Sequence, residues 1–190
     1  MEKNIAKRKS SGKLKVENSN FNIEVINEQI LISKDIARLI SFYIFNIPFK
    51  QLTAQAVELC EYGWNDPWNK PEALNKRMKD AFYNLDYLQL NANVDDMIDE
   101  LKNANMGSDF PIDINSERIC INDCAGNQYL SILRHIRNCF CHGRFQIIQR
   151  KRHPDVFVFE DVNSNKNVNG RMIITRKTLV AWMEIIKGGP

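Results

Sequence analysis

Residues 129–148 read YLSILRHIRNCFCHGRFQII, and the spacing of the hydrophobic residues changes within this stretch. Its first part predicts a helix that ends near His142, because apolar residues recur there at helical spacing. Gly143 follows, and glycine commonly terminates helices. From Phe145 onward, residues that favour strands replace the helical pattern. We therefore expect a core helix that leads directly into a β-strand. The residues that define the helical stripe are Tyr129, Leu133, Ile136 and Phe140.

Upstream of this stretch, the sequence predicts further helices. Apolar residues recur at helical spacing over residues 33–45, 48–62 and 71–88, and the last of these stripes is the most regular. Asn93 is a suitable cap for a fourth helix, which would end before Gly107. The segment from there to residue 127 is polar and gives no clear secondary-structure signal.

Downstream, the sequence predicts three strands and a last helix. Runs rich in strand formers occupy residues 145–148, 156–159 and 172–175, and turn residues such as those of NSNKNVNG separate them. Thr175 then precedes an amphipathic segment and is a suitable helix cap. We expect these strands to form a small antiparallel sheet.

Length and composition indicate one domain. The chain has 190 residues, of which 44% are apolar, and this suits a single hydrophobic core. Residues 1–20 are rich in Lys and show no apolar period, so they are expected to form a flexible basic tail. The expected fold is a mainly α single domain over residues 21–190. Its parts are a helical core at about 33–142, a small β-hairpin region at about 144–175 and a C-terminal helix at about 176–187.

The sequence lacks the usual signals for a membrane or for export. No apolar stretch reaches the ~20 residues that a membrane-spanning helix needs. The basic start has no apolar core of signal-peptide length. The five cysteines are then expected to be reduced thiols. We expect a cytoplasmic protein with no membrane partner.

Charge is distributed unevenly along the chain. Between Asp123 and Asp155 there is no acidic residue, although six Lys or Arg residues and all three histidines lie there. Such a local excess of positive charge attracts polyanions, above all phosphate backbones. The basic residues of this window are Arg134, Arg137, Arg144, Arg150, Lys151 and Arg152.

Three polar residues of the core helix suggest a chemistry. At about 100° per residue, Arg137, Asn138 and His142 lie on the side of the helix away from its apolar stripe. Cleavage of RNA without a metal needs a base for the 2′-hydroxyl proton and a fixed positive charge at the phosphate, roles that suit His142 and Arg137. Asn138 would orient the ribose or the imidazole. Arg137 and His142 are about 140° apart, so they share a phosphate only if the helix loosens at its end or a second chain contributes its copy.

Residues 137–142, RNCFCH, resemble the R-x4-H motif of the HEPN domains (higher eukaryotes and prokaryotes nucleotide-binding), in which Asn often follows the arginine. The surrounding residues 133–145 resemble the end of that family's core helix. The resemblance implies an all-helical bundle that is usually dimeric, with two motifs facing each other. It also implies a metal-independent endoribonuclease without a cofactor, in a toxin–antitoxin or antiphage setting. Arg137 and His142 would be catalytic and Asn138 auxiliary. Relatives silenced by a nucleotidyltransferase resemble R-x4-H-x-Y, but Arg144 stands at that tyrosine position.

The expected function is therefore cleavage of RNA by 2′-hydroxyl attack, with an antitoxin or defence-complex protein as a further partner. The residues expected to bind the substrate are Arg134, Arg144, Arg150, Lys151 and Arg152.

Two alternatives stay open. The first is a non-catalytic HEPN-like module that binds RNA or dimerises. The second is a zinc-stabilised interaction domain, although the spacing of Cys120, Cys124, Cys139 and Cys141 misses the usual C-x2-C pattern. His135 has no identifiable partner in the sequence and is expected at the surface.

Overall fold

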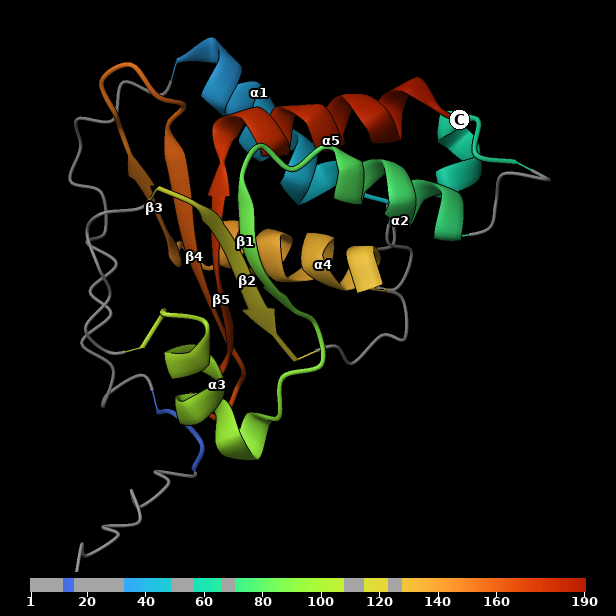
Figure 1. Cartoon of the computed structure of the whole chain (residues 1–190). Coiled ribbons are helices and arrows are strands. Elements are labelled where there is room, and N and C mark those ends of the chain that lie inside the picture. Colours follow the sequence, from blue (N-terminus) through green and yellow to red (C-terminus); the bar gives the residue numbers. More distant parts are fainter. Residues whose placement is uncertain (1–11, 16–32, 49–56, 66–70, 108–114, 123–127) are drawn as a thin grey trace, which may run out of the picture.

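The computed structural model describes residues 12–15, 33–48, 57–65, 71–107, 115–122 and 128–190. Within these residues the chain forms an α+β fold, in which helices flank a five-stranded mixed sheet (Figure 1). The expectation of a mainly α domain with a small hairpin is therefore wrong. The helices are α1 (Lys34–Phe45), α2 (Pro71–Asp80), α3 (Met97–Asn103), α4 (Gln128–Cys141) and α5 (Arg176–Gly188). The strands are β1 (Leu85–Gln89), β2 (Glu117–Ile121), β3 (Phe145–Ile148), β4 (Val156–Val162) and β5 (Val168–Thr175).

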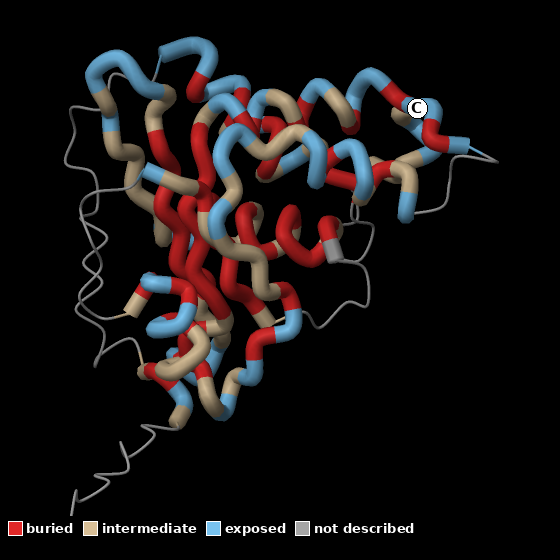
Figure 2. Tube along the Cα trace, viewed as in Figure 1, coloured by how far each residue is buried: buried red, intermediate tan, exposed pale blue. Residues whose placement is uncertain are grey.

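The strands lie in the order β1-β2-β5-β4-β3. β1 and β2 are parallel, whereas β5 is antiparallel to both β2 and β4, and β3 is antiparallel to β4. β5 is the central strand, and its residues are mostly buried, as the tube coloured by burial illustrates (Figure 2). The three strands expected after the core helix are confirmed, but they make up only part of the sheet.

The two faces of the sheet have separate hydrophobic cores. Successive side chains of a strand point to opposite faces, and β4 follows this rule. Phe157 and Phe159 pack with α1, α2, α4 and α5. Val156 and Val158 pack with α3 on the other face. β4 is thus covered by apolar side chains on both faces, which is typical of a strand inside a layered fold.

The predicted helix over residues 71–88 is half wrong. α2 ends at Asp80, and Leu85 lies in β1 instead of continuing the helix. The backbone N–H groups of Tyr83 and Asn84 both donate to the carboxylate of Glu117, at 2.8 and 3.1 Å. Glu117 begins β2, a strand that was not predicted because its segment has no clear local pattern. A contact across about thirty residues therefore decides where this helix stops.

Three helical ends have a side-chain cap, and two of these caps, at Asn93 and Thr175, were predicted from the sequence. The side chain of Ser33 accepts from the N–H of Ile36 at the start of α1. Thr175 likewise accepts from the N–H of Thr178 at the start of α5. Asn93 caps the short 3-10 turn that precedes α3. These interactions lie within a few residues, so such caps can be predicted from the sequence alone.

Two other expectations fall largely outside the described residues. Of the helix expected over 48–62, the structure describes a 3-10 turn at Leu59–Tyr62. Of the expected basic tail, it describes residues 12–15, in which Leu14 is buried and its carbonyl accepts from Val168 N–H at 2.9 Å. Within the described ranges, no helix combines the length and apolar character that crossing a membrane requires.

Candidate functional site

The candidate site lies at the C-terminal end of α4, where the chain turns into β3. The N–H of Arg144 donates to the carbonyl of Cys139 at 2.8 Å, and the N–H of Gly143 donates to that of Phe140 at 3.4 Å. Gly143 has a φ of 65°. This is the Schellman arrangement, in which a left-handed glycine ends a helix and satisfies its last carbonyls. The predicted helix end is therefore confirmed, together with its mechanism.

The motif residues of α4 differ in exposure. His142 is exposed, whereas Arg137 and Asn138 are half-buried. None of these three side chains makes a hydrogen bond or an ion pair with the described part of the chain. An imidazole, a guanidinium and an amide at one helix end thus keep their hydrogen-bonding capacity for a ligand.

The structure does not loosen the end of α4. The N–H of His142 still donates to the carbonyl of Asn138 at 3.0 Å, as in a regular α-helix. Because the helical ladder continues to this residue, Arg137 and His142 keep an angular separation of about 140°. Arg137 and His142 of one chain therefore do not meet at one phosphate through a loosened helix end, which leaves a second chain as the other route.

Arg134 is the basic residue that shares a face with Arg137. The two are three residues apart, which makes them neighbours on a helix surface. Arg134 is half-buried and makes no ion pair among the described residues. Asn138 follows Arg134 by four residues and lies on the same stripe. α4 therefore presents two unpaired guanidinium groups and one amide in a row.

Arg144 has a different environment. Its Nη2 contacts the carboxylate of Glu160, and its Nε donates to the Glu160 carbonyl at 3.2 Å. Glu160 is fully buried and also accepts from Arg171 Nε and Nη2, at 3.0 and 2.8 Å. The guanidinium of Arg144 is thus held by β4 instead of projecting from the site.

The remaining basic residues lie in the β3–β4 loop. Lys151 and Arg152 are exposed, whereas Arg150 is half-buried and donates from its Nε to the carbonyl of Pro154 at 3.1 Å. The strand β3 separates this loop from the end of α4 (Figure 1). The acid-free window of the sequence therefore forms two basic regions, one along α4 and one at the tip of the hairpin.

His135 is buried, against the expectation of a surface position. Its Nδ1 lies 2.6 Å from Asp161 Oδ2, and its Nε2 lies 3.0 Å from the carbonyl of Asn122. Both ring nitrogens of His135 therefore lie beside oxygen atoms of other residues. Asp161 follows Phe157 and Phe159 on the face of β4 that α4 covers. Because successive side chains of a strand alternate between its faces, the sequence of β4 already placed Asp161 on the same face as Phe157 and Phe159, and this was the available signal for its contact with His135.

The described cysteines divide into exposed and buried thiols. Cys60 and Cys141 are exposed, and Cys120 and Cys139 are buried. Burial, with Glu100 nearby, raises the pKa of Cys120 to about 12, and burial raises the pKa of Cys139 well above its usual value. Both buried thiols therefore stay protonated near neutral pH and are poor nucleophiles. Among the residues that the structure describes, no three His, Cys, Asp or Glu side chains are grouped to hold a metal.

Comparison with known proteins leaves the chain without an assigned relative: no protein-family model matches it, and the curated proteins and the solved structures yield no significant match.

Proposed function

We propose that the protein is a metal-independent endoribonuclease whose active site forms at the end of α4 in a homodimer. The observation that supports this proposal is that Arg137, Asn138 and His142, none of them buried, make no hydrogen bond or ion pair with the described residues through their side chains. The proposal takes the chemistry of the R-x4-H motif without the all-helical bundle of the HEPN domains, because the fold here is α+β.

His142 acts as the general base in this mechanism. It removes the 2′-hydroxyl proton of the ribose, and the 2′-oxygen attacks the adjacent phosphorus. The bond from phosphorus to the 5′-oxygen breaks, and a protonated imidazole supplies the proton that this leaving oxygen needs. The products are a 2′,3′-cyclic phosphate and a 5′-hydroxyl end. Base catalysis by one such group typically contributes ~10²–10⁴-fold.

Arg137 stabilises the negative charge that develops on the non-bridging phosphate oxygens. Its planar guanidinium binds two such oxygens at once. Asn138 orients the ribose, and Arg134 binds the next phosphate along the α4 stripe. Arg144 does not contact the substrate in this mechanism; its contacts with Glu160 fix the position of the turn that follows α4.

A second copy of the chain is required because Arg137 and His142 diverge on a regular helix. In a two-fold dimer with the α4 ends together, Arg137 of one protomer lies beside His142 of the other, and the symmetry makes two such sites. The rival function is RNA binding without cleavage, which the Arg134–Arg137 stripe would support in a monomer as well.

The test measures cleavage of a labelled single-stranded RNA by the purified protein in excess EDTA. We expect cleavage with cyclic-phosphate products, and a loss of ~10²-fold or more in His142→Ala. Arg137→Ala should lose activity similarly. His153→Ala is the matched control, because it removes an exposed histidine of the β3–β4 loop. Full activity of His142→Ala, or a strict requirement for magnesium, contradicts the mechanism.

Mixing the two inactive variants tests the composite site. If each site takes Arg137 from one protomer and His142 from the other, a mixed dimer has one intact site of two. Because half of randomly mixed dimers are mixed, about a quarter of the wild-type activity should return. Sites within one protomer would give no recovery. Salt-sensitive RNA binding with no turnover in the wild type would instead establish the rival function.

A further inference from the structure

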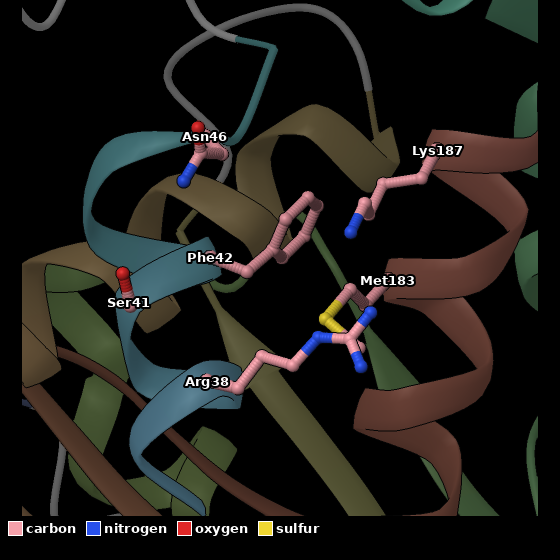
Figure 3. Close-up of a pocket in the computed structure, with 6 residues that line it drawn as sticks. All are labelled: Arg38, Ser41, Phe42, Asn46, Met183 and Lys187. Carbon is pink, nitrogen blue, oxygen red and sulfur yellow. The ribbon is translucent and has the colours of Figure 1, made fainter. Parts of the chain in front are cut away.

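α1 and α5 flank a cavity of about 200 Å³ that is open to solvent and belongs to neither the α4 site nor the β3–β4 loop. Phe42 and Met183 form its floor, and both are 4% exposed. Arg38 and Lys187 reach into the space above them from opposite helices (Figure 3). Ser41 and Asn46 complete the lining at its rim. The cavity thus combines an apolar floor with two cationic side chains and two uncharged polar ones.

The two cations of this cavity are unpaired. Neither Arg38 nor Lys187 makes an ion pair within the described part of the chain, and the lining contains no carboxylate. Asp35 and Glu184 precede them by three residues on the same helices, but both are exposed and neither forms an ion pair with them. Among the described residues, no carboxylate therefore forms an ion pair with either cation of the cavity.

Hydrogen bonds fix the backbone of the two helices that carry these cations. The hydroxyl of Tyr43 on α1 donates to the carbonyl of Leu179 on α5 at 2.9 Å. The indole of Trp64 donates to the carbonyl of Ile186, one residue before Lys187, at 3.0 Å. Both donors are 1% exposed or less. A ligand that binds both cations consequently does not have to order the backbone that carries them.

The helix dipoles oppose an anion here, but they are the weaker effect. Asn46 follows the last residue of α1, and Lys187 lies in the last turn of α5, so two negative helix ends are near the cavity. Each end is equivalent to roughly half a negative charge. The full positive charges of Arg38 and Lys187 are larger than these partial charges, so the helix ends do not cancel them. The attraction is real but moderate, and it weakens with salt.

We propose that this cavity binds a phosphate group, either as the free anion or as the monoester of a small compound. Arg38 and Lys187 balance the two negative charges, and the Ser41 hydroxyl and the Asn46 amide are additional donors. The volume is below the ~300–1,000 Å³ of typical pockets for drug-sized ligands, so it suits a small ligand. The apolar floor of Phe42 and Met183 accepts the carbon skeleton of a monoester.

The test titrates the purified protein with inorganic phosphate and, separately, with ribose 5-phosphate, by calorimetry at low salt. Wild type is expected to bind at least one of them saturably. Arg38→Gln and Lys187→Gln should each weaken binding at least about 5-fold, as expected for loss of a charged hydrogen bond. The control Lys76→Gln/Lys79→Gln removes two exposed cations of α2 and should bind like wild type.

The outcomes separate the two forms of the ligand from failure of the proposal. Tighter binding of ribose 5-phosphate by about 10-fold or more indicates a monoester, and equal binding indicates the free anion. The absence of saturation by both probes up to about 20 mM overturns the proposal. Unchanged binding in Arg38→Gln/Lys187→Gln overturns it as well. RNA cleavage by the α4 site is measured separately, so neither result depends on the other.

Discussion

The substitution Glu160→Gln is expected to destabilise the protein more than any change at its surface ion pairs. The carboxylate of Glu160 is fully buried and holds the guanidinium of Arg171, which is fully buried as well. Arg171 Nη1 also donates to the carbonyls of Met106 and Gly107, at 2.7 and 2.9 Å. One arginine of β5 thus joins β4 to the segment after α3. Glutamine keeps the shape of the side chain but removes its charge.

The size of the effect follows from the charge that remains. Burial already lowers the pKa of Arg171, and Glu160 opposes that shift. Without the carboxylate, Arg171 is a buried cation that keeps its bonds to the carbonyls of Met106 and Gly107 but has lost the charge of Glu160. Removing one partner of a buried ion pair typically costs about 3–5 kcal/mol. Arg144 is 29% exposed and turns to water at a smaller cost. For a chain of this size, the expected fall in melting temperature is about 6–20 °C.

Urea unfolding, followed by the fluorescence of the buried Trp64 and Trp182, measures this change. Asp155→Asn is the matched control, because it also removes one negative charge from an ion pair. The pair of Asp155 with Arg176 is longer, at 3.4 Å, and partly exposed. Its loss should cost less than about 1 kcal/mol.

A loss below about 1 kcal/mol in Glu160→Gln would refute the reasoning, since such a value is typical of exposed pairs. A second variant separates charge from packing. Glu160→Met/Arg171→Met removes both charges and should be more stable than Glu160→Gln, because no unpaired ion stays buried. If the double variant is the less stable of the two, hydrogen bonding and shape, not the unpaired charge, dominate at this position.

Three further changes test other parts of the fold. Gly170→Ala should prevent normal pairing of β5 with β2, because its Cβ would lie 2.6 Å from the carbonyl oxygen of Cys120. Gly143→Ala meets open space and should cost only about 1–2 kcal/mol, because alanine disfavours the positive φ of this position. Urea unfolding that finds Gly143→Ala to be the more damaging change contradicts this prediction. The pKa of the Cys120 thiol is near its usual value of 9 in the unfolded chain and about 12 in the folded one, so the free energy of unfolding should fall between these pH values by up to about 1.4 kcal/mol per pH unit. Urea titrations at several pH values should show a smaller alkaline slope in Cys120→Ala. An unchanged slope would exclude the thiol as its source. His135→Leu leaves Asp161 buried without the imidazole of His135 and should lower the free energy of unfolding by about 3–5 kcal/mol, measured by thermal unfolding. A change within about 0.5 kcal/mol, which is typical of surface substitutions, would show that the pair contributes little.

Exposure at the candidate site could be predicted from helix geometry alone. The positions of Arg134, Arg137 and Asn138 on the wheel placed them away from the apolar stripe, and all three are half-buried, outside the core. The surroundings of Arg144 and His135 could not be predicted in this way. Their partners, Glu160 and Asp161, lie on β4, and the pairing of a helix with a strand depends on how the sheet is assembled.

The sequence by itself determined the elements that depend on neighbours within a few residues. The cap of α5 at Thr175, the end of α4 at Gly143 and the strand conformation of β4 all reflect backbone conformation and hydrogen bonds over short spans. Such interactions form with the same local residues in any fold, so a periodic pattern and a capping residue are sufficient to predict them.

Only the tertiary structure decided the fold class. Leu85 and Leu88 continue the helical spacing of α2, but they lie in β1, because β2 supplies a parallel partner and Glu117 binds the N–H groups of the preceding turn. In a sheet, the backbone N–H and C=O groups form hydrogen bonds with residues that are distant in sequence. A local pattern does not show which distant segment will supply these partners. The same physical reason applies at the candidate site: the position of its residues on α4 is local, whereas the contact of Arg144 with Glu160 depends on how α4 and β4 pack.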